Sequence, residues 1–328
     1  MIYIETGSTD PTFNLAAEEY CLRNLESLPN ILMLWQNDNS IIIGRYQNAE
    51  KEINIDAVRR GKVKVVRRST GGGAVYHDLG NLNYSLIQSV SNPARLDLAG
   101  ASLPMVEALN KLGIPAVSQG RNDILLEGKK ISGAAQCVRG GRLLHHGTLL
   151  FSSNMDVLQD VLNVDSHKLY SKGISSVKSR VMNISDYPGF NMDITLFWKK
   201  LLDALGPVRP YAFSVEELEG VHRLQAEKYG TWQWNRGQAP AYKYSNERHF
   251  PGGKVEVSLN VKGGLITNCS ITGDFLGLTD IRELEEMLEG QRHERSHLLT
   301  LLENIPLPLY LGGIEPEELL DCMIEAVL

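Results

Sequence analysis

The order of its sequence patterns places this chain in the α+β class, with antiparallel or mixed sheets. Strand-like and helix-like segments are interspersed, and several strand pairs are joined by tight turns instead of helices. No internal repeat or low-complexity segment interrupts this arrangement. With 328 residues, the chain is long enough for one large domain or two of ordinary size, and its core needs neither disulfides nor a structural metal.

Strands are expected wherever a short apolar run is bounded by polar or turn residues. Residues 2–5 and 63–66 are runs of this kind. The runs 31–35 and 41–43 are separated by a short polar segment, so we expect them to form a hairpin.

Two later segments contain strand-length runs joined by glycine turns. Residues 123–151 turn at Gly128 and again at 140–141, which predicts a three-stranded antiparallel meander. Residues 254–272 turn at 263–264 and are expected to form another hairpin.

Helices are expected where apolar residues recur with a helical period. Residues 12–28 place Phe13 and Tyr20 roughly on one face. Residues 97–112 end at Gly113, a residue type that often follows the last turn of a helix. The other expected helices are 54–60, 155–162, 192–205, 214–228, 279–290, 294–303 and 315–327.

Composition bounds the functional class. The four cysteines lie far apart without CxxC spacing, which argues against zinc ribbons and thioredoxin-type redox chemistry, so we expect a reduced cytoplasmic protein. Because no apolar run approaches membrane-spanning length and the N-terminus lacks a secretory pattern, no membrane association is expected. Residues 59–68 are basic but lack interleaved aromatic residues, and the isoelectric point is about 5.8, so nucleic acid is not an expected partner. We expect a monomer.

Charge is unevenly distributed along the chain. Residues 274–328 carry 13 acidic and 3 basic side chains, a local net charge of −10, so residues 1–273 carry +4 of the total of −6. A basic larger part suggests an anionic ligand there. A solvated helical tail is the simplest interpretation of the acidic part. We place a domain boundary in the polar stretch near residue 246, which gives domains 1–246 and 247–328.

The most unusual segment is 67–78, Arg-Arg-Ser-Thr-Gly-Gly-Gly-Ala-Val-Tyr-His-Asp. Consecutive glycines lose much entropy on ordering, but they allow the backbone to approach a ligand and present N–H groups to an anion. Arg67 and Arg68 could add bidentate bonds to the same anion. The segment is neither a Walker A loop nor a dinucleotide fingerprint. A glycine hinge with solvent-facing arginines is the alternative.

Three further segments carry candidate groups. Lys130 lies where a strand leaves a turn, so it could point at a phosphate or carbonyl oxygen or be an exposed turn lysine. Asp123 could hold a metal, orient Lys130 or occupy a turn. His145 and His146 fall on opposite faces of a strand, so at most one faces a site, and a structural role is favoured for each. Residues 172–181, rich in basic and serine residues, suit a loop closing over an anion or a solvated connector.

Segment 67–78, with Asn81 and Ser85, resembles the glycine-rich motif of lipoate–protein ligases. Other segments resemble that family in the same order along the chain: 14–19, 34–35 with 43–48, 120–123, 130–133, 145–150 and 172–181. Residues 232–240 are similar to the start of the accessory region in two-domain bacterial members. Several motifs matched in order are far more specific than any one of them.

The resemblance implies a fold and a reaction. The fold would be a catalytic domain of the biotin and lipoate protein ligase type, plus a small α+β C-terminal accessory domain. MgATP would activate lipoate, or octanoate, to an acyl-adenylate and release pyrophosphate. The acyl group would then pass to a lysine of an apo lipoyl domain, such as the E2 subunits of 2-oxoacid dehydrogenases or the glycine cleavage H protein.

The resemblance also implies roles for residues. Lys130 would be the catalytic cation between carbonyl and phosphate, where developing charge needs fixed donors. ATP or the adenylate would contact Arg68, Gly71, Gly72, Gly73, Ala74, Val75, Tyr76, Lys130, Lys172 and Ser179. Lipoate would contact Lys130, His77, Arg45, Tyr84, Gly133 and His146, beside a wall near Leu15. Asp123 would hold Mg²⁺.

Two other activities stay open at this point. Octanoyl- or lipoyl-transferases of the same superfamily form a thioester on a cysteine and need no ATP. Residues 120–123 contain no cysteine, and Cys137 is expected to be a small core residue. A ligand-binding or regulatory protein would keep the pocket without the chemistry, but the retained Lys130 and the basic segments argue against it.

Overall fold

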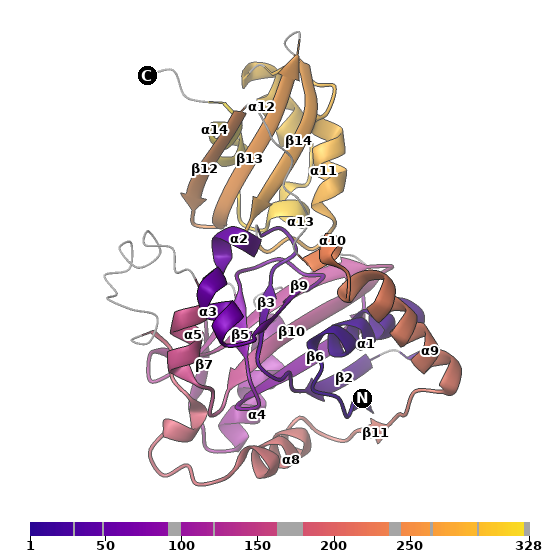
Figure 1. The fold of residues 1–328 in the computed structure, drawn as a ribbon, viewed down its shortest axis with the longest axis vertical. Coiled ribbons are helices and arrows are strands. Elements are labelled where there is room, and N and C mark those ends of the chain that lie inside the picture. The colour runs from indigo at the N-terminus through magenta and orange to yellow at the C-terminus, as the bar shows by residue number, and fades with distance from the viewer. Residues whose placement is uncertain are drawn as a thin grey trace.

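The computed structural model of the chain describes residues 1–28, 30–47, 49–90, 100–120, 122–162, 180–235, 244–262, 265–293 and 295–324. These residues form a larger N-terminal domain and a smaller C-terminal domain that stands above it in Figure 1. Within them, no helix is both long and apolar enough to cross a membrane.

An eight-stranded mixed sheet forms the centre of the larger domain, in the order β11-β1-β2-β6-β10-β9-β8-β7. Its strands are β1 (Ile2–Ile4), β2 (Asn30–Trp35), β6 (Asn81–Ser89), β7 (Ala116–Gln119), β8 (Asp123–Leu126), β9 (Lys129–Arg139), β10 (Arg142–Leu150) and β11 (Arg209–Pro210). β1 runs parallel to β2 and β11, and the other neighbours are antiparallel. The meander expected at 123–151 is confirmed as β8, β9 and β10.

A second, three-stranded sheet has the order β4-β3-β5. It consists of β3 (Ser40–Ile43), β4 (Lys64–Arg67) and β5 (Val75–His77). The expected hairpin between 31–35 and 41–43 is therefore wrong, because these strands belong to different sheets. The segment between them is anchored in the interior by Asn37, which is fully buried and whose side chain bonds to Asn14 and His77.

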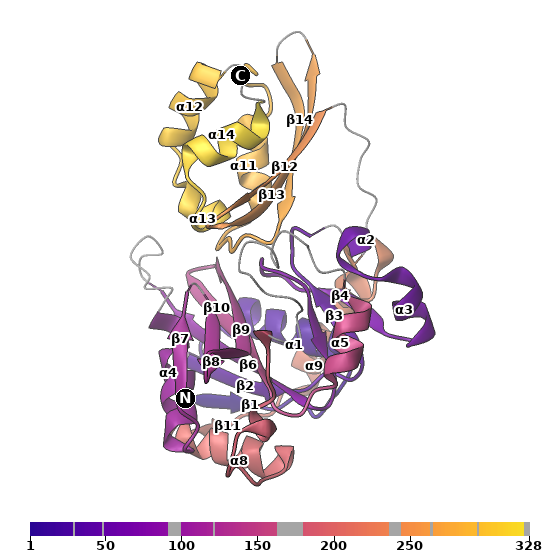
Figure 2. The same ribbon diagram turned by 90° about the vertical axis from the view of Figure 1, so that its left-hand side faces the viewer.

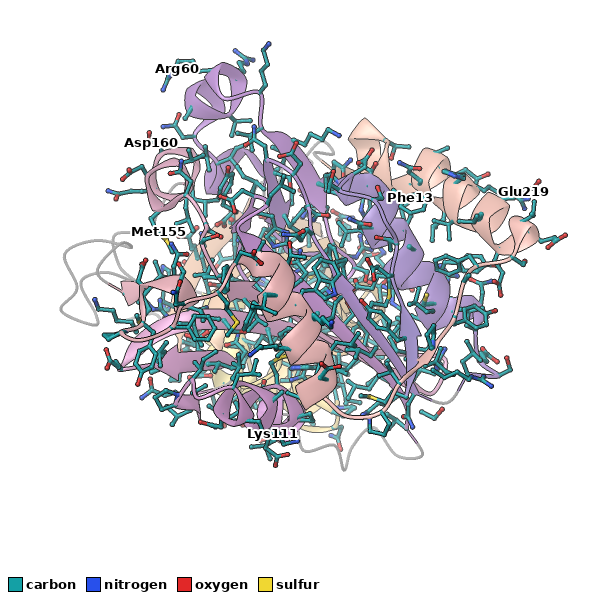
Figure 3. The ribbon with its side chains drawn as sticks, turned by 90° about the horizontal axis from the view of Figure 1, so that it is seen from below. Phe13, Arg60, Lys111, Met155, Asp160 and Glu219 are labelled. Atoms are coloured by element: carbon teal, nitrogen blue, oxygen red, sulfur yellow. The ribbon has the colours of Figure 1, made fainter. Side chains whose placement is uncertain are left out.

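Helices cover both faces of the large sheet. α1 (Pro11–Asn24) and α9 (Val215–Leu224) share one buried core with it, and α4 (Leu103–Lys111) and α8 (Ile194–Ala204) share another. Lys111 Nζ donates to the Ala204 carbonyl at 3.0 Å and ties α4 to α8, which lie together in Figure 3. The shorter helical elements are α2 (Ala49–Glu52), α3 (Ile55–Arg60), α5 (Met155–Val161), α10 (Trp232–Asn235), a π-helical turn (Gln225–Tyr229) and 3₁₀ turns (Gly100–Ser102 and Ile184–Asp186).

Most expected helices are confirmed with shifted ends. The helix expected at 12–28 stops four residues early, at Asn24, and the one expected at 214–228 changes to a π-helical turn after Leu224. Part of the helix expected at 97–112 falls on residues outside the described chain. Gly113 follows that helix with a φ of +79°, as expected for a terminating glycine.

The C-terminal domain is a three-stranded antiparallel sheet with helices on one face, as Figure 2 shows. Its elements are β12 (Tyr244–Phe250), β13 (Gly253–Lys262), β14 (Leu265–Gly273), α11 (Ile281–Leu288), α12 (Arg295–Glu303), α13 (Leu307–Leu311) and α14 (Pro316–Met323). They bury a core of their own, so the acidic region is a folded domain and not a solvated tail. Because the polar stretch near residue 246 lies largely inside β12, a cut at that position would divide the strand.

Tyr46, between β3 and α2, joins the two domains. Its ring lies in the C-terminal core and stacks on Phe275, with 4.8 Å between the ring centroids. Its hydroxyl donates to the Thr279 carbonyl at 2.7 Å. Close by, the Gly72 N–H donates to the Phe275 carbonyl at 3.0 Å. The C-terminal domain therefore directly contacts residues 67–78, which we call the glycine segment.

Candidate active site

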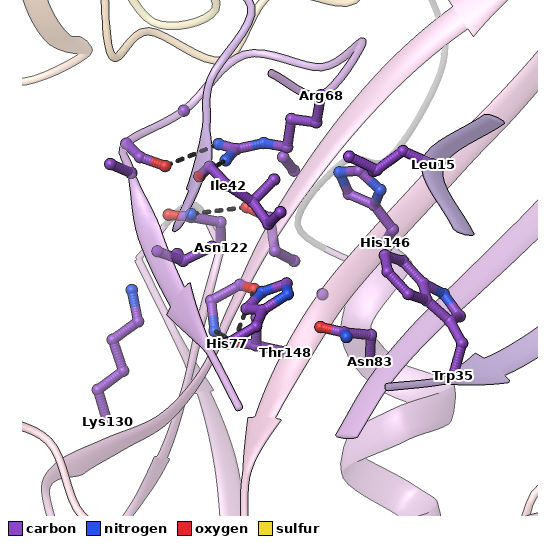
Figure 4. Close-up of a pocket in the computed structure, with 18 residues that line it drawn as sticks. Leu15, Trp35, Ile42, Arg68, His77, Asn83, Asn122, Lys130, His146 and Thr148 are labelled. Carbon is purple, nitrogen blue, oxygen red and sulfur yellow. Dashed lines mark hydrogen bonds between the residues drawn. The ribbon is translucent and has the colours of Figure 1, made fainter. Parts of the chain in front are cut away.

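A pocket lies between the two sheets of the larger domain, on the side of α1 (Figure 4). It encloses about 610 Å³ of space, counting its open mouth. Its walls come from both sheets and from α1: Leu15, Trp35, Ile42, Arg68, Gly72, Gly73, Ala74, Val75, His77, Asn83, Asn122, Lys130, Gly133, Ala134, Ala135, His146, Gly147 and Thr148. The pocket thus brings together side chains from the glycine segment, the Lys130 turn and the histidine strand.

Along the floor of the pocket, residues face one another across neighbouring strands, in a row that continues beyond the lining to Asp123. Trp35 on β2 lies opposite Asn83 on β6, and Asn83 lies opposite Thr148 on β10. Gly133 on β9 comes next, since its N–H donates to Thr148 Oγ1 at 3.3 Å, and Asp123 on β8 lies opposite Gly133. The row therefore leads from an aromatic end to a charged end.

Lys130 occupies the charged end. Its Nζ lies 2.6 Å from Asp123 Oδ1, and the other oxygen of Asp123 lies 3.1 Å from a guanidinium nitrogen of Arg180. A Cβ on Gly133 would lie 2.7 Å from Lys130 Nζ, so a glycine there leaves room for the lysine to lie over β9. Of the alternatives for Lys130, an unattached turn lysine does not fit, because a carboxylate holds its ammonium group at the pocket.

The glycine segment closes the pocket on the side of the C-terminal domain. A Cβ on Gly71 would meet the Phe275 carbonyl oxygen at 2.3 Å, and Gly72 adopts a φ of +89°, which favours glycine. The side of Gly73 where a Cβ would project is open, with nothing within 4 Å. The Gly72 N–H is engaged by the other domain, so the segment does not present all of its N–H groups to the pocket.

Arg68 shapes the glycine segment from within. Its buried guanidinium donates to the carbonyl oxygens of Gly71 (2.6 Å), Gly73 (2.8 Å) and Ile42 (3.0 Å). Burial lowers the pKa of Arg68 to about 10, so the group still carries its charge at neutral pH. Arg67 is also buried and donates to backbone carbonyls outside the pocket. The alternative of two solvent-facing arginines is therefore wrong.

The two neighbouring histidines do point in opposite directions, as expected. His146 lines the pocket, where its Nδ1 lies 2.8 Å from Glu18 Oε1 and its Nε2 lies 2.7 Å from Thr70 Oγ1. His145 lies on the other face of β10, and burial lowers its pKa to about 3. Only His146 can contribute to this site.

Several residues proposed from the resemblance lie outside the lining. Tyr84 packs in the core on the opposite face of the large sheet, because it alternates with Asn83 along β6. Arg45 stacks over Trp234 and lies 3.7 Å from Asp280, at the junction of the domains. The Tyr76 ring packs in the core behind the small sheet. Gly71 is turned towards Phe275, and Lys172 and Ser179 lie outside the described residues.

Sequence reasoning missed Asn83, Asn122 and Thr148, which all line the pocket. It also missed the role of Glu18, the buried partner of His146. A signal for Asn83 was present: along β6, polar residues at 81, 83 and 85 alternate with apolar ones, which predicts one polar face inside a buried strand.

Comparisons with known proteins show the family to which both domains are similar. Residues 10–206 match the family described as "Lipoyl protein ligase A/B catalytic domain", and residues 239–323 match "Bacterial lipoate protein ligase C-terminus". The lipoate-protein ligase LplJ of Bacillus subtilis (strain 168) is 40% identical over 98% of this chain and 99% of its own length. The structure of LipL1 of P. falciparum in complex with lipoate matches with a TM-score of 0.75 and 26% identity, over 93% of this chain and 94% of that one. An ATP-bound lipoate-protein ligase A matches with a TM-score of 0.60 and 31% identity, over 72% of this chain and 97% of that one.

Proposed function

Because the chain belongs to the lipoate–protein ligase family and is a ligase, we propose that it makes lipoyl-adenylate from lipoate and ATP and transfers the lipoyl group to apo lipoyl domains. One observation carries this proposal: the same pocket joins an aromatic end at Trp35 to a cationic end at Lys130, beside the glycine segment. An apolar acid fits such a pocket with its carboxylate at Lys130. The reaction it needs is activation of that carboxylate, because a free carboxylate does not acylate an amine at neutral pH.

In the first step, a lipoate carboxylate oxygen attacks the α-phosphorus of ATP. The new P–O bond forms as the bond to the leaving pyrophosphate breaks. Negative charge spreads over the phosphoryl oxygens, and we assign Lys130 the role of the fixed cation that stabilises it. Arg68 keeps the carbonyls of Gly71 and Gly73 turned towards itself, so we assign it the positioning of the glycine segment, with its guanidinium at the pocket wall.

Asp123 is the carboxylate we propose for Mg²⁺. Magnesium is commonly held by one or two carboxylates together with substrate phosphates, and Asp123 lies at the charged end of the row where those phosphates would be. Its two oxygens contact Lys130, which lines the pocket, and Arg180, so a metal ion there would take the place of one of these ion pairs. The metal would neutralise phosphate charge there.

In the second step, the lysine amine of an acceptor domain attacks the acyl carbonyl carbon. The C–N bond forms, AMP leaves with the electrons of the C–O bond, and the amine loses a proton. Lys130 would stabilise the carbonyl oxygen in this step as well. The acceptors we propose are E2 subunits of 2-oxoacid dehydrogenases and the glycine cleavage H protein.

All four cysteines are buried and free, which supports the reducing, cytoplasmic location expected from the sequence.

A transferase that uses Cys137 is the competing function. Cys137 is 3% exposed and packs in the core with α1, and burial raises its pKa to about 12. A thiol in that state is a poor nucleophile at neutral pH. The pocket lining also does not include Cys137. Activation by ATP is therefore the function that the site supports better.

The test is incubation of the purified chain with ATP, lipoate and a panel of apo lipoyl domains, followed by intact mass analysis. We expect one lipoyl group on an acceptor and pyrophosphate release that depends on lipoate. Acceptor modification from an acyl donor without ATP would contradict the proposal and favour the transferase.

A further inference from the structure

His77 presents a buried N–H group to the aromatic end of the pocket. Asn14 Nδ2 faces the carbonyls of Ser8 and Gln36, which can only accept, so it is a donor that shares its two hydrogens among three neighbours. The Asn37 atom that faces it at 3.0 Å is therefore the acceptor Oδ1 and not a second donor. Asn37 Nδ2 must then donate to His77 Nδ1 at 3.1 Å. Burial lowers the pKa of His77 to about 3, so the ring is neutral and its hydrogen is on Nε2. Among the residues that the structure describes, this buried Nε2–H has no partner.

Asn83 presents a second buried donor to the same end. Its Oδ1 accepts from Asn81 Nδ2 at 2.9 Å, which leaves its Nδ2 for another partner. Asn83 is 1% exposed, and its Nδ2 is buried without a partner within the described chain. Figure 4 shows the Asn83 amide and the His77 ring pointing into the space beside Trp35. The His77 and Trp35 ring centroids are 6.4 Å apart.

The spacing of the row tells which part of a substrate reaches these donors. Neighbouring strands are about 4.8 Å apart, so Asn83 lies about 10 Å from Gly133, over which Lys130 Nζ is placed. An extended eight-carbon acid is roughly this long. With its carboxylate at Lys130, the distal end of lipoate, a ring containing two sulfur atoms, would lie beside Asn83 and His77.

We propose that the Nε2–H of His77 and the Nδ2–H of Asn83 donate to the ring sulfur atoms of lipoate, which makes Asn83 a residue that selects the dithiolane over an alkyl chain. This inference rests on the proposed function and extends it to the choice among acyl substrates. A disulfide sulfur is a weak hydrogen-bond acceptor, but even a weak acceptor stabilises a buried donor that has no other partner. When an alkyl chain fills the same space, both donors stay buried and unpaired, which costs free energy.

The inference can be tested first on the unaltered enzyme. Pyrophosphate release with ATP is measured for lipoate, octanoate and 5-cyclopentylpentanoate, which keeps the ring shape but has no sulfur. Because a site with buried donors rejects an analogue that leaves them unpaired, we expect kcat/KM to favour lipoate over the carbocycle by about tenfold. Since the sulfurs are remote from the reacting carboxylate, the difference should lie mainly in KM. Equal kcat/KM values for the two acids would overturn the inference.

Substitution then assigns the preference to a residue. Asn83→Leu keeps a similar volume without the donor, so the ratio of lipoate to carbocycle should fall by about fivefold or more. Both acids are measured on one preparation, so the folded fraction cancels. Asn268→Leu, on β14 of the C-terminal domain, is the matched control and should keep the ratio of the unaltered enzyme. An unchanged ratio in active Asn83→Leu would sink the role of Asn83. If no acid supports pyrophosphate release in the unaltered enzyme, the proposed function itself has failed.

Discussion

Lys130 is the residue on which the proposed chemistry depends most. Replacing it with Ala should lower lipoate-dependent pyrophosphate release by well over tenfold, about 1.4 kcal/mol in barrier for each factor of ten. The fold should survive, because Asp123 keeps its ion pair with Arg180 and is not left as an unpaired charge.

Lys129 supplies the control for that variant. It is the exposed neighbour of Lys130 at the start of β9, so Lys129→Ala should release pyrophosphate at nearly the rate of the unaltered enzyme. Circular dichroism checks that both variants are folded. If Lys130→Ala kept more than about a tenth of the rate, Lys130 would not be the catalytic cation.

A substitution at Cys137 distinguishes the ligase from the transferase, because only the transferase needs the sulfur atom as a nucleophile. Cys137→Ser should form lipoyl-adenylate and modify the acceptor at nearly the normal rate per folded molecule. A serine hydroxyl in this core costs about 1–3 kcal/mol of stability when it finds no partner, so rates are referred to the folded fraction. Intact mass analysis of the unaltered enzyme with acyl donor should show no acyl group on Cys137. A thioester there, or a folded but inactive variant, would support the transferase.

At the scale of single residues, sequence reasoning found side chains with unusual chemistry and missed ordinary ones. Lys130 stands out by type and position, whereas His146 was expected at the site only from the family resemblance, and both line the pocket. Asn83 also lines the pocket. An asparagine in a strand is unremarkable, however, until the structure shows that its amide has no partner among the described residues. Tyr84 was placed at the site although alternation with Asn83 puts it on the opposite face, so period two alone could have excluded it.

At the scale of elements, the glycine segment packs on the C-terminal domain at one glycine and faces open space at another. Adding one methyl group at each position tests this difference. Gly71→Ala would press a Cβ onto the Phe275 carbonyl at 2.3 Å, whereas the same change at Gly73 enters open space. Gly71→Ala should therefore destabilise the packing of the two domains by about 1–3 kcal/mol. Thermal unfolding should show a lower midpoint for Gly71→Ala and a nearly unchanged one for Gly73→Ala. Equal midpoints would mean that the domains do not pack on Gly71 in solution.

The element predictions succeeded where local pattern decides the structure and failed where long-range packing does. The meander of β8, β9 and β10 is built by tight glycine turns, and its sequence shows them. The supposed hairpin at 31–43 failed because the connection, with Asn37 buried within it, crosses from one sheet to the other. Nothing local in two apolar runs tells whether they pair with each other or with strands far along the chain.

On the scale of the whole molecule, the contact between the domains could not be predicted from composition. Charge suggested a basic part and an acidic part, and Arg45 with Asp280 is one contact of that kind. Another contact is apolar: Tyr46 belongs to one domain by sequence and to the core of the other by packing. A single tyrosine in a polar loop gives no sign of this in the sequence.

The position of the C-terminal domain predicts which step needs it. The Phe275 carbonyl accepts the Gly72 N–H, so this domain supports the glycine segment from outside the pocket. In the proposed reaction, the first step needs that segment held around ATP, whereas the second needs the mouth open to a protein. A two-domain enzyme can meet both needs by moving one domain. Removing residues 244–328, a cut ahead of β12, should therefore impair adenylation more than transfer from preformed lipoyl-adenylate.

The truncated chain exposes Tyr46 and the apolar surface near it, so its solubility and circular dichroism are measured first. Two rates are then compared in the folded fraction: pyrophosphate release with ATP and lipoate, and modification of an apo lipoyl domain from synthetic lipoyl-adenylate. Tyr46→Ser in the full-length chain is the companion variant, because it loosens the same contact without removing the acidic domain, and it should shift the two rates in the same direction by less. Loss of transfer alone would mean that the C-terminal domain docks the acceptor. Equal loss of both rates would mean that it only stabilises the fold. If it supports the glycine segment, its removal should slow the ATP-dependent step more than the transfer step.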